Sequence, residues 1–258
     1  MVFGPQPGRA RMDFGLSGPI PKDILVLLGV TFLSYALGAF ASTRPLIDLL
    51  QLGPGVLRGF LWQLVTYPAA SSYDQGALGF LITLWMILVF GKQVFGFVGR
   101  KAFWRHFVIS ALVAGVIAVL VERVMALAGS TSPFVPFTLM QGRAFILAFL
   151  ITGFATLYGN ATIYFMFVLP LKASWFIGLE ILLAFLLFLS YQDFAGFIGI
   201  CAAVGASYML FSGRGPMRFF HETRLRIERR ILERKLRKMR GKGGDGDGGG
   251  LVQGPWVN

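Results

Sequence analysis

Long apolar stretches recur along the chain, each bounded by charged residues, proline or glycine. A helix needs about 20 mainly apolar residues to cross the hydrocarbon core of a bilayer. Each spanning segment must also satisfy its own backbone hydrogen bonds, so apolar blocks joined by short loops favour helices over barrel strands. The pattern predicts six transmembrane helices: Ile24–Phe40, Ala77–Phe95, Phe103–Leu120, Ala144–Leu157, Ser174–Ser190 and Phe194–Phe211.

The polar residues outside these stretches divide the chain into four parts. Prolines lie among glycines in residues 1–22, and this pattern predicts an irregular cytoplasmic N-tail. Residues 23–212 form the membrane domain, in which Tyr158–Pro170 is apolar but broken by glycine and asparagine, as in a re-entrant or interfacial segment. Residues 213–240 predict a basic juxtamembrane helix, and 241–258 a flexible glycine-rich tail.

The first apolar stretch has a second interpretation, a cleavable signal peptide. Its apolar core is longer than the usual core of a signal peptide, and about 23 polar or turn-forming residues precede it. We therefore interpret this stretch as a signal anchor.

Composition strengthens the membrane interpretation. Of the 258 residues 55% are hydrophobic and 14% are charged, whereas soluble domains average about 25% charged residues. The apolar content excludes a disordered chain. The single cysteine, Cys201, cannot form an internal disulfide, and no Cys/His cluster has metal-site spacing. We predict a polytopic membrane protein without a metal or other cofactor.

The distribution of positive charge predicts the orientation. Lys and Arg concentrate on the cytoplasmic side of membrane proteins. With the N-terminus inside, 20 Lys and Arg residues lie on inner segments and 4 on outer segments. Both termini are then cytoplasmic, which requires an even number of spans.

The basic tail accounts for much of the net charge of +12. Its helix formers and charge predict attraction to anionic lipid headgroups. A coiled coil with a partner is an alternative, and binding to nucleic acid is unlikely. The lipid-surface candidates are Arg224, Arg226, Arg229, Arg230, Arg234 and Lys235.

Two segments carry a specific resemblance. Leu57–Gly91 contains the run WQLVTYP and ends in VFG, and Lys92–Phe103 continues it as KQVFGFVGRKAF. Tyr158–Phe176 reads YGNATIYFMFVLPLKASWF. Together they resemble the rhomboid intramembrane serine protease family, over about residues 23–212. The resemblance implies an all-α membrane protein, a rhomboid-like bundle of six transmembrane helices with a short central fourth helix. The loop 42–75 would lie partly in the outer leaflet, and the six-span form fits a bacterial cytoplasmic (inner) membrane.

The chain lacks the residues that the chemistry of this family requires. Those proteases use a serine nucleophile opening the fourth helix, a histidine base on the sixth, and a His/Asn pair on the second. A serine hydroxyl is a weak nucleophile without a neighbouring base. Carried over from the matched motifs, the nucleophile position is Ala144 and the base position Asp193, and the second-helix positions are Gly79 and Thr83. All four are degenerate, so no catalytic residue is predicted.

No replacement dyad is visible. His106 opens the third stretch from the cytoplasmic side, and His221 lies in the basic tail. Every lysine is predicted to be cytoplasmic, which leaves the outer serines without a base. These serines are Ser71, Ser72, Ser130 and Ser132.

The resemblance therefore implies a rhomboid-like pseudoprotease. It would bind transmembrane segments of other membrane proteins and influence their folding, assembly or turnover without cleaving them. Fold alone does not dictate function, so two alternatives stay open. One is an active rhomboid-type intramembrane serine endopeptidase with unorthodox catalytic groups. The other is a small transporter or channel, although no internal repeat supports it.

Four residues are candidates for partner binding. Trp62 opens the family-like motif as an interfacial anchor. Arg143 and Asp193 would flank the vacant catalytic cavity, either as an ion pair or as solvated loop residues. Glu180 lies inside the fifth stretch and is a functional candidate by default, unless it pairs with Lys172 or with a Ser or Tyr of a neighbouring helix.

Small residues recur every four positions on the sixth stretch, from Ala195 through Gly199 and Ala203 to Ser207. Such spacing lets membrane helices approach closely. We expect this face to pack against the fourth helix.

Overall fold

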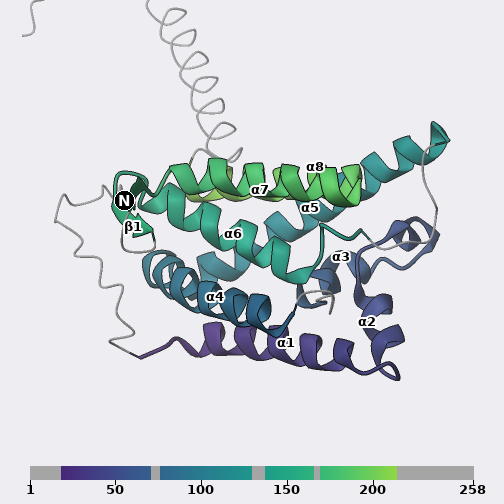
Figure 1. Ribbon diagram of the computed structural model, residues 1–258, viewed down its shortest axis with the longest axis horizontal. Helices are drawn as coiled ribbons and strands as arrows, with labels where there is room; N and C mark the ends of the chain where they lie inside the picture. Colours follow the sequence, from purple (N-terminus) through teal and green to yellow (C-terminus); the bar gives the residue numbers. More distant parts are fainter. Residues whose placement is uncertain (1–18, 71–75, 130–136, 166–168, 214–258) are drawn as a thin grey trace, which may run out of the picture. The chain divides into compact units, whose positions relative to one another are not determined.

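The computed structural model describes residues 19–70, 76–129, 137–165 and 169–213 (Figure 1). The chain divides after Ser212 into two units, and the second unit lies almost entirely outside the described residues. The predicted N-tail up to residue 18, the basic helix at 213–240 with its six lipid-surface residues, and the glycine-rich tail therefore stay predictions.

All six predicted spans are helices. By length and composition, four helices of the described part are suited to crossing a membrane, whereas α6 and α7 are shorter, at 16 and 17 residues. Their bounds are α1 Lys22–Ala39, α4 Ala77–Val98, α5 Arg100–Leu127, α6 Gly142–Leu157, α7 Trp175–Tyr191 and α8 Phe194–Phe211.

The connection from α1 to α4 is built from short elements. It contains α2 (Arg44–Leu50), the 3-10 helix η1 (Pro54–Arg58), α3 (Gln63–Thr66) and a second 3-10 turn, η2 (Tyr67–Ala69). Several of its large apolar side chains are exposed, among them Leu61 and Val65. The position of the loop partly in the outer leaflet stays a prediction.

The apolar segment after α6 forms a hairpin. Strand β1 (Thr162–Phe165) pairs antiparallel with β2 (Leu169–Lys172), with Thr162 opposite Lys172. The backbone N–H and C=O groups of the two strands hydrogen-bond to each other. In a re-entrant loop these groups would need partners from the surroundings. The hairpin is thus the structure adopted by the segment predicted to be re-entrant or interfacial.

Burial differs sharply between the two shorter helices. Eleven of the 16 residues of α6 are buried, so α6 is central, as the resemblance implied. In α7 only Phe176 and Ala184 are buried, and apolar side chains such as Leu183 are exposed. A helix with apolar side chains exposed around most of its circumference is typical of contact with lipid or with another membrane protein.

The helices alternate in direction. Tyr35 of α1 stacks on Phe80 of α4 with ring centroids 3.8 Å apart, and Ile24 of α1 packs beside Gly91 near the other end of α4, so the pair is antiparallel. We call the end of the bundle at the start of α1 the Asp23 end, and the opposite end the Asp193 end. In Figure 1 the hairpin lies at the former, and α2 and α3 at the latter.

The small-residue face of α8 packs mainly against α5 rather than α6. The Ser207 and Ser110 hydroxyls hydrogen-bond at 3.1 Å, both fully buried. A Cβ on Gly199 would lie 2.9 Å from the Cβ of Ala118 on α5. The small residues of α5 let α8 approach closely there. The predicted contact with the fourth helix is also present, because a Cβ on Gly153 of α6 would lie 2.7 Å from the ring of Phe211 on α8.

Candidate functional site

The family-like motif Trp62–Pro68 anchors the loop to the bundle. Thr66 Oγ1 donates to the carbonyl of Leu50 at 3.0 Å, and Gln63 Nε2 donates to that of Leu49 at 3.3 Å. Tyr67 is fully buried and donates its hydroxyl to the carbonyl of Ala111 on α5 at 3.0 Å. Burial raises the pKa of the Tyr67 phenol well above its ordinary value, which keeps the phenol a donor.

Trp62 lies on the surface of this loop. Its indole Nε1 donates to the carbonyl of Leu49 at 3.3 Å, and its ring packs beside Phe60 with centroids 4.9 Å apart. The side chain is 43% exposed. An amphipathic ring with its N–H bonded and its face exposed fits the predicted interfacial anchor.

The loop closes directly over the start of α6. The backbone N–H of Gly142 donates to the carbonyl of Ala70 at 2.8 Å. A Cβ on Gly142 would lie 2.7 Å from the carbonyl oxygen of Pro68, so only glycine fits here. Ala144 follows within the first turn of α6 and is half-buried. Ala144, the position predicted for the nucleophile, thus lies directly beyond the contact between loop and helix.

Asp193, the position predicted for the base, caps α8. Its Oδ1 accepts from the backbone N–H of Gly196 at 2.7 Å. Its Oδ2 accepts from the backbone N–H of Leu139 at 2.9 Å and from Thr138 Oγ1 at 3.2 Å. The carboxylate therefore joins the start of α8 to the segment before α6. An aspartate directly before an apolar helix is a known N-cap signal, and it could have been found in the sequence.

Gly79 and Thr83, the two predicted second-helix positions, are joined by a hydrogen bond. Thr83 is buried, and its Oγ1 donates to the carbonyl of Gly79 at 3.0 Å, one turn earlier in α4. A threonine hydroxyl that donates to a carbonyl of its own helix has its hydrogen bond without a partner from another segment.

The described histidine lies far from these positions. The ring of His106 packs edge to face on Phe211, the last residue of α8, with centroids 5.2 Å apart. Asp193 caps the other end of this 18-residue helix, roughly 27 Å away at 1.5 Å per residue. The outer serines and His221 lie outside the described residues.

Arg143 is the second residue of α6 and is half-buried. Its place at the Asp193 end is the one expected for a residue flanking the vacant site. The ion pair with Asp193 stays a prediction, although both oxygens of that carboxylate already accept hydrogen bonds.

Glu180 lies on the inner face of α7. The buried positions Phe176 and Ala184 lie four residues before and after it, so all three share one helix face. Its Oε2 atom is buried and has no hydrogen-bond partner in the described part of the chain. Lys172, the expected partner, is exposed at the end of β2.

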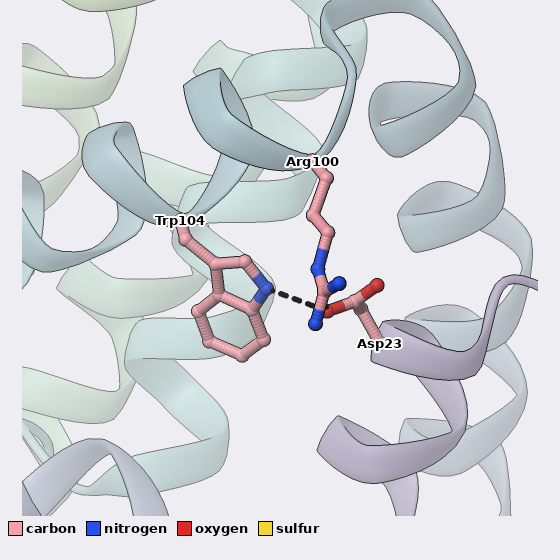
Figure 2. Close-up of polar contacts among 3 residues, drawn as sticks. All are labelled: Asp23, Arg100 and Trp104. Carbon is pink, nitrogen blue, oxygen red and sulfur yellow. Dashed lines mark hydrogen bonds and ion pairs between the residues drawn. The ribbon is translucent and has the colours of Figure 1, made fainter.

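One polar cluster was missed in the sequence. Asp23, at the start of α1, accepts from Arg100 Nε at 3.0 Å and from Trp104 Nε1 at 2.9 Å (Figure 2). Arg100 and Trp104 lie one turn apart on α5, whereas Asp23 is 77 positions before Arg100. The sequence could not predict this cluster, because no local pattern links positions so distant.

Among the described residues no cluster of His, Cys, Asp or Glu has the composition of a metal site. Comparison with protein families gives a match to a family described as "Eukaryotic integral membrane protein (DUF1751)", over residues 25–233. Neither the curated proteins nor the solved structures gave a significant match. The predicted bacterial inner-membrane location is wrong, since the matched family is eukaryotic. Six spans and charge asymmetry occur in the membranes of both kinds of cell, so neither feature could distinguish them.

Proposed function

We propose that this chain, which belongs to the eukaryotic integral membrane protein family DUF1751, is a rhomboid-like pseudoprotease. It binds transmembrane segments of other membrane proteins and influences their folding, assembly or turnover without cleaving them. The proposal has three parts: the topology, the lost chemistry and the partner surface.

The helix directions support a topology of six spans with both termini on the cytoplasmic side. Antiparallel contacts return α8 to the Asp23 end, where Phe211 meets His106 near the start of α5. The starts of α1 and α5 meet there as well, through Asp23 and Arg100. Among the described residues, most Lys and Arg side chains belong to the same end, namely Lys22, Lys92, Arg100, Lys101, Arg105 and Lys172. The shortness of α6 is no obstacle, because other helices and the loop cover it and it need not match the full bilayer.

The observation that supports the loss of proteolytic activity is the hydrogen bonding of Asp193. A general base must lie within hydrogen-bond reach of the proton that it removes. Here both carboxylate oxygens accept from donors that hold α8 and the segment before α6. The residue at the predicted nucleophile position, Ala144, has a methyl group that cannot attack a carbonyl. The scaffold is therefore kept while its reaction is lost.

The partner surface that we propose is α7. It buries two of its 17 residues and exposes a continuous apolar surface. Association of helices in lipid depends on packing and hydrogen bonds, which an exposed helix of this kind can offer to a client.

Photocrosslinking from the full chain in native membranes tests the proposal. A photoreactive residue at Leu183 of α7 should give adducts with other membrane proteins at their full length. The matched control is Leu112 of α5, also an exposed apolar position. We expect at least a fivefold excess of protein adducts from position 183. Equal adducts from both positions would contradict the partner surface.

A serine-reactive fluorophosphonate probe tests the lost chemistry separately. The full chain should stay unlabelled, together with its Ala144→Gly variant. Labelling of the unmodified chain would show that a nucleophile exists elsewhere and would overturn the pseudoprotease proposal.

A further inference from the structure

We propose that Glu180 on α7 binds a client transmembrane helix through one basic side chain, a lysine or an arginine. This inference rests on the proposed function and names the class of client. The client's basic residue lies in the half of the bilayer nearer the Asp23 end, because α7 starts at that end and Glu180 lies about 9 Å, six residues, beyond Ser174.

The position of Glu180 on α7 lets a client reach it. The residue shares the inner face with Phe176 and Ala184, which are buried, whereas Glu180 is half-buried. Glu180 therefore lies at the border between the face of α7 that packs on the bundle and the face that is exposed. A helix docking along α7 would contact this border without unfolding the bundle.

Aromatic contacts attach α7 to the bundle on either side of Glu180. Near the Asp193 end, Phe188 packs on Phe194 and Phe197 of α8, with centroids 5.9 and 5.5 Å apart. Near the Asp23 end, Phe176 meets Phe90 of α4 at 6.2 Å. Glu180 lies between these two aromatic contacts. A Cβ on Gly178, two residues earlier, would meet no atom within 4 Å.

The chemistry of Glu180 calls for a donor. An ionisable group inside a membrane is costly and is almost always paired. The buried Oε2 of Glu180 has no hydrogen-bond partner among the described residues, and the nearest lysine in sequence, Lys172, is exposed. A basic side chain on a client offers both the opposite charge and the missing hydrogen bond. Charge complementarity therefore selects a client with Lys or Arg at this depth.

A charge-swap experiment on the full chain in microsomes tests the inference. The probes are single-span helices of leucine and alanine with one Lys, one Asp or one Leu, placed six residues from the cytoplasmic boundary. Capture is measured by photocrosslinking from Leu183. We expect the Lys probe to be captured about tenfold more than the Leu probe. Glu180→Gln should remove most of this excess. Glu180→Lys should abolish capture of the Lys probe and give capture of the Asp probe.

Two controls keep the outcomes separate. Asp48→Asn removes an exposed carboxylate on α2 and should leave capture unchanged. A Lys probe with its charge moved to the other end of the helix should be captured no better than the Leu probe. Equal capture of the Lys and Leu probes by the unmodified chain, with strong crosslinks from α7, would overturn the inference and leave the proposed function standing. Absence of all capture from α7 would contradict both.

Discussion

At the scale of single residues, Asp193 shows how one carboxylate can join two segments that lie far apart in the sequence. Its carboxylate accepts three hydrogen bonds from two separate segments. The sequence placed this residue correctly at the start of the last helix but could not give its partners. Leu139 and Thr138 lie more than fifty positions away, and one of the donors is a backbone N–H, which every residue type carries.

Replacement of Asp193 tests this structural role. Asp193→Ala removes the cap of α8 and leaves the N–H of Leu139 without its acceptor, so the free energy of unfolding should fall by about 2 kcal/mol. Asp193→Asn keeps an acceptor oxygen and should lose less than half of that. Unfolding in detergent micelles, followed by circular dichroism, measures both variants. Equal losses for the two would show that charge, rather than hydrogen bonding, is what matters.

At the scale of elements, the apolar pattern predicted the helices well and their neighbours poorly. The bounds of α8 are the predicted ones, and α6 and α7 differ from the prediction by no more than two residues. Hydropathy marks where a helix lies in lipid but not which helix it faces. Hydropathy therefore could not predict which helix contacts the small-residue face, nor the β1–β2 hairpin, because both depend on contacts between segments.

Substitution of two glycines of α8, one packed and one in open space, distinguishes the effect of packing from that of helix propensity. Gly199→Ala would place a methyl group 2.9 Å from the Cβ of Ala118, so we expect a loss of about 1–3 kcal/mol. Gly205→Ala meets nothing within 4 Å and should be neutral or stabilise by up to about 1 kcal/mol. Thermal unfolding of the purified variants compares them. A similar loss at both positions would contradict close packing of α8 on α5.

At the scale of the whole molecule, one cluster joins the first span to the third. Arg100 is 75% exposed in its side chain, so its ion pair with Asp23 should contribute only about 0.5 kcal/mol. Asp23→Ala also leaves the indole N–H of Trp104 without an acceptor and should cost about 1 kcal/mol more. A double-mutant cycle over Asp23 and Trp104, read by thermal unfolding, measures this coupling. A coupling of zero would show that the two side chains do not bond in the folded protein.

The proposed topology is tested by glycosylation mapping, which suits a eukaryotic membrane protein. An acceptor sequon inserted after Gly129, between α5 and α6, should be glycosylated in microsomes. Sequons added at either terminus should remain unmodified, because six spans return the chain to the cytoplasmic side. Modification at one terminus alone would indicate an odd number of spans.

The hydrogen bonds to Asp23 also constrain the order in which the helices complete their contacts during synthesis. The ribosome finishes Arg100 and Trp104 long after the first span has left the exit tunnel. Until then, the carboxylate at the start of α1 has neither of its native donors and must stay hydrated at the membrane surface. The first helix, α1, therefore completes its native contacts at Asp23 only after α5 has been inserted.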